Sequence, residues 1–284
     1  MLQHELETAI SAARLASKTI LKHYAEGFET EHKIGADNFS EPVTIADRES
    51  SRIIVDALSA AFPDDAILSE EEIDDTVDRV TKERTWIIDP IDGTSGFVNH
   101  DGDFAVQIGL AENGVAVLGV VLLPFHDVLT YAVRGCGAFI ETGEDGNPAR
   151  LHVSNTAELD RLKLAMSRNH ASARMARIIA EFGFAEIVRR GSVGLKVGLI
   201  AQQESDIYIH PSPRTKLWDT CGPQVILEEA GGRFTDLFGQ DFRYDRVDVQ
   251  NHNGIIATNG VSHDAALRRM KPLLAEFGRI PHVY

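Results

Sequence analysis

Apolar residues recur at helical and strand-like spacings through the first part of the chain. Over residues 2–24 they return every three or four positions, which predicts an amphipathic helix. The same spacing predicts a second helix over 44–62, which Pro63 stops. Short apolar runs at 66–68 and 85–88 predict two buried strands, each followed by acidic residues.

A meander of strands is predicted next. Apolar runs at 104–111 and 115–123 are joined through Asn113-Gly114, a dipeptide typical of tight hairpins, and runs at 128–133 and 138–140 continue the pattern. Beyond the meander, strands and helices alternate at 162–166, 172–182, 185–188, 191–202, 206–209, 219–230, 255–258 and 262–277. These rhythms predict an N-terminal α+β domain over residues 1–155 and a C-terminal α/β domain over residues 156–284.

Composition narrows the class of partner. The 284 residues are 43% hydrophobic and 25% charged, as in ordinary globular proteins, but the formal net charge is −15. An acidic chain of this kind is a poor partner for a nucleic-acid polymer, because phosphate backbones are bound by basic surfaces. A small phosphorylated ligand stays compatible, because a bound metal can supply local positive charge.

Neither a membrane span nor a secretion signal is expected. The longest apolar run, 115–125, is too short to cross a bilayer, and the N-terminus lacks a basic start and a long apolar core. Cys136 and Cys221 fit no zinc motif and are expected as reduced thiols. The sequence therefore predicts a cytoplasmic protein with no membrane partner.

The segment from Trp86 to Thr94 carries the first chemical signal, Trp-Ile-Ile-Asp-Pro-Ile-Asp-Gly-Thr. An apolar run delivers Asp89 and Asp92 to one end, and Pro90 between them predicts a turn. Two carboxylates ~4 Å apart at an effective dielectric constant of ~20 repel by about 4 kcal/mol. A hard cation such as Mg²⁺ relieves that repulsion, so we expect a divalent-metal site here.

Three other acidic positions lie at the ends of predicted elements. Asp47 falls in the first turn of the second helix, Glu70 follows a strand, and Asp219 opens a later helix. Each also has a plain structural explanation, because acids at helix starts act as caps, and residues 70–72 could be solvated surface. Taken singly, these three positions favour the structural explanation. The Asp89-Asp92 pair favours a functional one, because ligands of open α/β sheets bind at the carboxyl ends of strands.

Three motifs together resemble the inositol monophosphatase superfamily. They are Ser-Glu-Glu at 69–71, Asp-Pro-Ile-Asp-Gly-Thr at 89–94 and Trp-Asp-Thr at 218–220. Their order and separations match, and the resemblance extends over nearly the whole chain. Members of this superfamily are magnesium-dependent, lithium-sensitive phosphomonoesterases. The resemblance therefore implies a five-layered αβαβα sandwich, which combines α+β and α/β halves, with the site between them.

The resemblance also implies roles for individual residues. The implied Mg²⁺ ligands are Glu70, Asp89 and the Ile91 main-chain oxygen for one ion, and Asp89, Asp92 and Asp219 for the second. Asp47 would act on a third, weaker ion or its water, so two or three ions are expected. Glu70 and the Thr94 hydroxyl would position and deprotonate the attacking water, and main-chain N–H groups of Gly93 and Thr94 would hold the phosphate.

Substrate preference is suggested by the second half of the chain. Residues 211–223 are more similar to 3′(2′),5′-bisphosphate nucleotidases than to inositol phosphatases, because 211–216 are basic where inositol enzymes carry an acid. Ser167-Arg168-Asn169-His170 resembles a nucleotide-contacting element, with Asn169 in place of the usual serine. The implied substrate-binding set is Asp92, Gly93, Thr94, Ser167, His170, Ser192, Lys196 and Asp219.

Alternatives remain open at this stage. Lys196 could be an ordinary surface lysine, His170 a helix-start residue, and His210 stands where some nucleotidases carry a different residue. The sequence favours a nucleotidase that removes the 3′-phosphate of adenosine 3′,5′-bisphosphate. A sugar, polyol, inositol or histidinol monophosphatase is the alternative, and a non-catalytic metal- or phosphate-binding regulator is a third. Either a monomer or a homodimer acting on a small phosphorylated metabolite fits these features.

Overall fold

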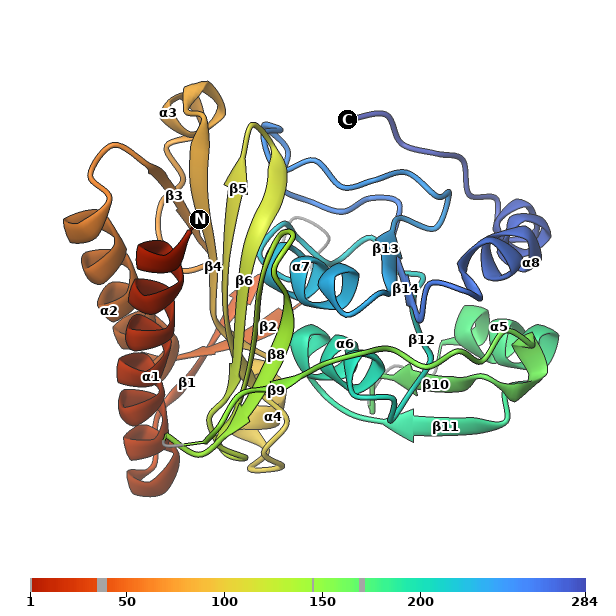
Figure 1. The fold of residues 1–284 in the computed structure, drawn as a ribbon, viewed down its shortest axis with the longest axis horizontal. Helices are drawn as coiled ribbons and strands as arrows, with labels where there is room; N and C mark the ends of the chain where they lie inside the picture. Colours follow the sequence, from red (N-terminus) through yellow and green to blue (C-terminus); the bar gives the residue numbers. More distant parts are fainter. Residues whose placement is uncertain (1, 35–39, 145, 169–171) are drawn as a thin grey trace.

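Helices and sheets alternate in five layers, αβαβα (Figure 1). The computed structural model describes residues 2–34, 40–144, 146–168 and 172–284. Within these ranges the helices are α1 (Gln3–Glu26), α2 (Ile45–Ala61), α3 (Thr76–Thr81), α4 (Thr94–Val98), α5 (Ala173–Phe182), α6 (Val193–Ala201), α7 (Cys221–Glu229) and α8 (His263–Glu276). The strands are β1 (Thr30–Ile34), β2 (Ser40–Thr44), β3 (Ala66–Ser69), β4 (Arg84–Asp92), β5 (Ala105–Glu112), β6 (Val115–Leu123), β7 (Val128–Val133), β8 (Gly137–Thr142), β9 (Ala149–Arg150), β10 (Lys163–Met166), β11 (Glu186–Arg189), β12 (Ile207–His210), β13 (Arg233–Thr235) and β14 (Ile255–Thr258).

The larger sheet has seven strands in the order β3-β4-β5-β6-β7-β8-β9. β3 and β4 run parallel, and the later neighbours are antiparallel. Helices α1 and α2 cover one face (Figure 1), where Ala9 and Ala13 of α1 belong to one core with Trp86 and Ile88 of β4. Residues 85–92 of β4 are buried, so this strand carries its C-terminal end into the interior.

The smaller sheet has the order β11-β10-β12-β14-β13, with β10, β11 and β12 parallel and β14 antiparallel to its neighbours. Helices α6 and α7 lie between the sheets (Figure 1). Gly109 and Gly119 face each other across β5 and β6, and a Cβ at Gly119 would lie 2.2 Å from the main-chain oxygen of Gly222 in α7. The missing side chains therefore let α7, and the turn before it, pack closely on the large sheet.

Most of the predicted elements are confirmed. The first two helices are α1 and α2, and Asn113-Gly114 joins β5 to β6 with φ angles of 49° and 74°, as a tight hairpin turn requires. The alternation expected after the meander is present from β10 to α8. No helix in the described part of the chain is long and apolar enough to cross a membrane.

The predicted turn at Asp89 needs a correction. β4 continues through Pro90 to Asp92, and its pairing with β5 slips, because Asp89 pairs with Gln107 and Asp92 with Ala105. Between these pairs, two residues of β4 (Pro90 and Ile91) thus oppose one residue of β5 (Val106), which is a β-bulge. Proline cannot donate a hydrogen bond to the ladder, and a bulge accommodates it without ending the strand.

Two further differences concern elements near the site. The predicted helix over 219–230 begins at Cys221, so Asp219 lies in the turn before α7. The antiparallel pair β1–β2 was not predicted, because its residues are mostly polar and do not alternate with period two.

Candidate active site

A cavity of about 270 Å³ is lined by both halves of the chain, and its lining contains both acidic and cationic residues. The acidic residues are Glu70, Asp89, Asp92, Asp101 and Asp219, and the cationic residues are Arg168, Lys196, Arg214 and Lys216. This volume suits a small metabolite and not a polymer.

Three carboxylates from distant parts of the sequence meet in this cavity. Asp89, Asp92 and Asp219 each place an oxygen within 4.8 Å of the other two. Asp89 and Asp92 are 2% and 5% exposed, and the Asp89 carboxylate accepts the Ile91 N–H at 3.0 Å, which orients it within the bulge. One oxygen of Asp219 accepts the Lys216 N–H at 2.6 Å. Three of the predicted metal ligands therefore lie together, and Glu70 is not part of this close group.

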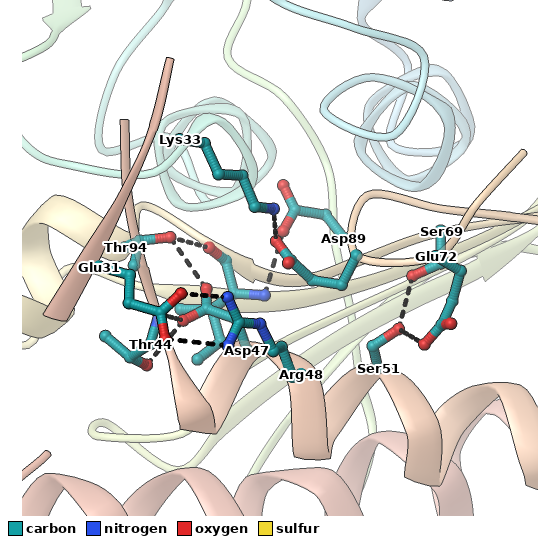
Figure 2. Close-up of polar contacts among 12 residues, drawn as sticks. Glu31, Lys33, Thr44, Asp47, Arg48, Ser51, Ser69, Glu72, Asp89 and Thr94 are labelled. Carbon is teal, nitrogen blue, oxygen red and sulfur yellow. Dashed lines mark hydrogen bonds and ion pairs between the residues drawn. The ribbon is translucent and has the colours of Figure 1, made fainter. Parts of the chain in front are cut away.

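Asp47 serves the helix and the site at once (Figure 2). Its Oδ2 accepts the Thr44 main-chain N–H at 2.8 Å and the Thr44 hydroxyl at 2.7 Å, which forms a capping box at the start of α2. Its Oδ1 lies 3.1 Å from the Thr94 hydroxyl, which lines the cavity. The capping explanation and the functional explanation are therefore compatible, one for each oxygen.

The acidic residues that follow β3 make different contacts. Glu70 lines the cavity and its N–H donates to the Ile88 main-chain oxygen at 3.2 Å, which continues the β3–β4 pairing. Glu71 forms an ion pair with Lys33 of β1. Figure 2 shows the Lys33 side chain extending towards Asp89. Glu70 and Glu71 are partly buried, so the alternative of a fully solvated run is wrong for both.

Asp92 connects β4 with the start of α6. Its Oδ2 accepts the Ser192 hydroxyl at 2.5 Å and the Gly194 N–H at 2.8 Å, while the Ser192 hydroxyl oxygen also accepts the Leu195 N–H at 3.1 Å. Ser192 has a φ of 54°, which is unusual for a residue with a side chain. Strained backbone of this kind persists where surrounding contacts over-determine it, often at functional sites.

Lys196 is buried, so its interpretation as a surface lysine is wrong. The side chain is 2% exposed, and its ammonium donates to the main-chain oxygens of Gly191 (3.2 Å) and Ser192. Burial lowers the pKa of Lys196 to about 8, although the charges of Asp92, Asp103 and Asp219 oppose that shift. Lys196 therefore offsets the negative charge of Asp92 and also holds the main chain at Gly191 and Ser192.

The sequence did not predict that Asp103 would hold two arginine side chains beside the cavity. Asp103 is fully buried and accepts hydrogen bonds from Arg190 (3.0 Å) and from the Gly191 N–H (2.7 Å), and it forms an ion pair with Arg168 at 2.8 Å. Arg168 lines the cavity. No motif marks Asp103. The only signal was an acid directly before the apolar run at 104–111.

The remaining predicted residues are placed as follows. Gly93, Thr94, Ser167, Ser192 and Ile91 line the cavity. His170, proposed as a substrate ligand, lies outside the described residues.

Comparison with known proteins identifies the protein family. The family described as "Inositol monophosphatase family" matches residues 1–274. The chain belongs to the inositol monophosphatase family. It is 30% identical to a fructose-1,6-bisphosphatase/inositol-1-monophosphatase of Thermotoga maritima, over 96% of this chain and 98% of that protein. It is also 34% identical to a histidinol-phosphatase of Mycobacterium tuberculosis (81% and 84%) and 31% identical to the 3′(2′),5′-bisphosphate nucleotidase CysQ of Escherichia coli K12 (84% and 93%).

Solved structures of inositol monophosphatase family proteins have the same fold. The Thermotoga maritima IMPase superposes with a TM-score of 0.81 at 29% identity, and it covers 97% of this chain and 100% of that chain. CysQ of Bacteroides thetaiotaomicron superposes with a TM-score of 0.76 at 30% identity, covering 90% and 97%. The expected αβαβα sandwich is therefore confirmed.

The acidic cluster fits the Mg²⁺ on which inositol monophosphatase family phosphatases depend. Burial raises the pKa of Asp89 well above its usual value, and the charges of Glu70, Asp92 and Asp219 raise it further. Burial also raises the pKa of Asp92, although Lys196 opposes that shift. Crowded carboxylates that resist ionisation are stabilised as anions by a hard divalent cation, whose preferred ligands are oxygens.

Gly93 offers a direct test of the geometry at this inositol monophosphatase family site. Its φ is 92°, and an added Cβ would lie 2.8 Å from the Asp103 main-chain oxygen. We expect Gly93→Ala to destabilise the protein by about 1–3 kcal/mol and to reduce phosphatase activity more than tenfold, because the turn carrying Thr94 must move. Chemical denaturation and phosphate release measure the two effects.

Gly135→Ala is the matched control for this variant. Gly135 also has a positive φ, 81°, but nothing lies within 4 Å of an added Cβ. Compared with the wild type, Gly135→Ala should lose about 1 kcal/mol of stability and keep its phosphatase activity. Equal activities of the two variants would contradict the assigned role of the Gly93 turn.

Proposed function

We propose that the protein is a Mg²⁺-dependent phosphomonoesterase whose substrate carries a second anionic group, and that this substrate is adenosine 3′,5′-bisphosphate, from which it removes the 3′-phosphate. The observation that carries this proposal is the number of cationic residues in the cavity lining. Lining the same space as the carboxylates are Arg168, Lys196, Arg214 and Lys216. A buried anionic group without a positive partner is unstable, so a cavity of this composition favours a substrate with two charged ends.

The placement of Arg168 supports the second-phosphate interpretation. Asp103 and Asp101 hold its guanidinium at 2.8 and 3.6 Å, which leaves the side chain oriented at the cavity before a ligand arrives. Arginine in a fixed orientation binds phosphate oxygens strongly through its planar fork of donors. Lys196 already donates to two main-chain oxygens, so at most one of its three N–H groups remains for a ligand.

We assign the metal site to Glu70, Asp89, the Ile91 main-chain oxygen, Asp92 and Asp219. When bound there, Mg²⁺ would supply the positive charge that stabilises a phosphoryl group under attack. In the overall hydrolysis a water oxygen bonds to phosphorus and the bond between phosphorus and the ester oxygen breaks. The Thr94 hydroxyl, 3.1 Å from Asp47 Oδ1, can pass a proton towards that carboxylate, whose pKa burial raises to about 6. The main-chain N–H groups of Gly93 and Thr94, at the start of α4, would orient phosphate oxygens.

A panel of phosphate esters tests the substrate. With Mg²⁺ present and released phosphate as the readout, adenosine 3′,5′-bisphosphate should give a much higher kcat/KM than inositol 1-phosphate, fructose 1,6-bisphosphate or histidinol phosphate. Comparable values for the nucleotide and inositol 1-phosphate would refute the nucleotidase assignment. If activity is highest on histidinol phosphate or a sugar phosphate, the alternative of a sugar, polyol, inositol or histidinol monophosphatase is supported. Relatives named for such activities are among those compared above.

Arg168→Gln should separate the two phosphate subsites. Losing a charge-assisted contact costs about 1.5–3 kcal/mol, so we expect KM for the bisphosphate to rise roughly 10- to 100-fold while activity on inositol 1-phosphate changes little. Arg190→Gln is the matched control, because Arg190 also contacts Asp103, at 3.0 Å, but does not line the cavity. A similar loss on both substrates, or the same loss in Arg190→Gln, would remove Arg168 from the second-phosphate site.

We also infer the setting of this activity. Two free cysteines, Cys136 and Cys221, are consistent with a reducing cytoplasm. We propose residues 1–155 and 156–284 as the two domains, since the chain passes from the seven-stranded to the five-stranded sheet between β9 and β10. The proposal holds for either a monomer or a homodimer.

A further inference from the structure

A second group of metal-ligating side chains lies apart from the active site. Asp248 and His252 belong to the loop between β13 and β14, and His282 belongs to the tail after α8. One ligand atom from each lies within 4.8 Å of the other two. None of the three lines the cavity that holds Asp89. Figure 1 shows the tail running from α8 to the C-terminus.

The tail is held against this loop by main-chain contacts. The Asn253 side chain, 1% exposed, donates to the His282 main-chain oxygen at 3.0 Å and accepts the His282 N–H at 2.7 Å. Arg279 donates to the main-chain oxygens of Pro211 (2.7 Å) and His252 (2.6 Å). The imidazole of His282 is therefore carried on a fixed backbone, although the residue itself is exposed.

Further contacts hold the last residue. The Tyr284 hydroxyl accepts the Asn253 main-chain N–H at 3.3 Å, and the Arg246 guanidinium lies 3.8 Å from the centre of the Tyr284 ring. Positions on both sides of His282 are thus anchored, which limits the conformational freedom that a ligand at this point would have to remove.

The donor set differs in kind from that of the active site. The two imidazole rings lie 4.3 Å apart between centroids, and His252 Nε2 lies 2.7 Å from Asp248 Oδ2. We propose that Asp248, His252 and His282 form a binding site for a borderline divalent cation of the Zn²⁺ class. Imidazole nitrogens with one carboxylate oxygen are ligands that Zn²⁺ accepts with a water in the fourth position. The all-oxygen cluster at Asp89 suits Mg²⁺ instead.

The spacing is close to what such an ion needs. Tetrahedral ligands about 2.0–2.1 Å from Zn²⁺ lie about 3.3 Å from one another. His252 Nε2 and Asp248 Oδ2 lie 2.7 Å apart, and no two of the three ligand atoms are more than 4.8 Å apart, so only small movements separate them from that spacing. Without a cation, the contacts among the three side chains are one partly exposed hydrogen bond and one contact between rings, which contribute little to stability.

An ion at this site would join the tail to a loop that supports the active site. In that loop the Val249 main-chain oxygen accepts the Leu217 N–H at 2.9 Å, and the Asn251 N–H donates to the Thr215 oxygen at 2.8 Å. Leu217 and Thr215 belong to the segment that carries Asp219. The cation would therefore stabilise the wall of the cavity without touching the substrate.

Zn²⁺ and Co²⁺ binding to the intact protein, with Mg²⁺ in large excess, tests the site. By calorimetry the wild type should bind one Zn²⁺ that His282→Gln binds more than about tenfold more weakly, since even a lost outer contact costs a metal site that much. Co²⁺ should give the strong visible bands of a four-coordinate ion in the wild type and lose them in His282→Gln. His152→Gln, an exposed histidine elsewhere, is the matched control and should behave as wild type.

Stability separates this site from a structural role for His282. Zn²⁺ should raise the melting temperature of the wild type and of His152→Gln but not of His282→Gln. All three proteins should have equal melting temperatures and phosphatase rates in Mg²⁺ alone. Identical Zn²⁺ affinity in wild type and His282→Gln would overturn the proposal, as would a Co²⁺ spectrum of a six-coordinate aqueous ion. Because the readout is binding, failure of this inference leaves the phosphatase assignment unaffected.

Discussion

We expect Asp89→Asn to lower kcat/KM for phosphate-ester hydrolysis by more than about 1000-fold. Asp89 is the central carboxylate of the proposed metal site, and its amide replacement keeps the shape but removes the charge that would hold a cation beside the substrate. Phosphate release measured over a Mg²⁺ titration gives both the rate and the Mg²⁺ dependence, and we expect the midpoint of that titration to rise as well.

Asp236→Asn is the matched control for this loss. Asp236 is as buried as Asp89, at 2% exposure, and it accepts main-chain hydrogen bonds from Phe238 and Gln240, but it does not line the cavity. This variant should lose stability and keep its catalytic rate at low temperature. If Asp89→Asn hydrolysed phosphate esters at the wild-type rate, the assignment of catalytic activity to this site would have to be dropped. A non-catalytic metal- or phosphate-binding regulator would then be favoured.

The second large effect is a loss of stability of the metal-free protein as pH rises, which Mg²⁺ reverses. Burial raises the pKa of Glu70 to about 8, where Asp219 and Glu71 add to the shift and Lys33 opposes it, and burial raises the pKa of Asp47 to about 6. A carboxyl group with a raised folded-state pKa contributes stability below its unfolded pKa and loses it as pH rises through the folded pKa. The window therefore runs from about pH 4 to about pH 8.

Within this pH window, His263 works in the opposite direction. Burial lowers the pKa of His263 to about 4, so this residue contributes stability that grows as pH rises towards 6.5. The net decline should accordingly be clearest between about pH 6.5 and pH 8. Over that interval the Glu70 shift alone corresponds to about 2 kcal/mol, since each pKa unit is about 1.4 kcal/mol.

Chemical denaturation with and without Mg²⁺ measures this linkage. The stability gained from Mg²⁺ should grow with pH, because more of the carboxylates are then ionised and in need of a cation. The difference between the two series cancels the contribution of His263. Asp89→Asn should gain much less from Mg²⁺ at pH 8 than the wild type. A Mg²⁺ effect that is constant from pH 5 to pH 8 would show that the cluster is not the site of binding.

Local chemistry explains what could be predicted from the chain alone. The spacing of apolar residues predicted α1 and α2, and Asn113-Gly114 predicted the β5–β6 turn, because these features depend on periodicity and on backbone conformations of single residues. The motifs at 69–71, 89–94 and 218–220 indicated the family by their residue types and order. Assignments of this kind need no knowledge of which segments pack together.

The predictions failed where an element depends on its neighbours. β4 does not end at Asp89, because its pairing with β5 absorbs Pro90 in a bulge. Lys196 has the composition of a surface residue but is buried, because α6 is packed between two sheets and Asp92 offsets its charge. Neither fact is encoded within a few residues of the position concerned.

The sequence by itself determined the family and most of the helices and strands in their order, and it predicted the acids of the proposed metal site. Tertiary structure alone decided that Asp219 comes within 4.8 Å of Asp89 and Asp92, and that Asp103 orients Arg168. The physical reason is distance along the chain. Helices and turns arise from contacts between near neighbours, whereas the meeting of residues 89 and 219 arises from close packing of α7 against the large sheet, where Gly119 leaves room for its backbone.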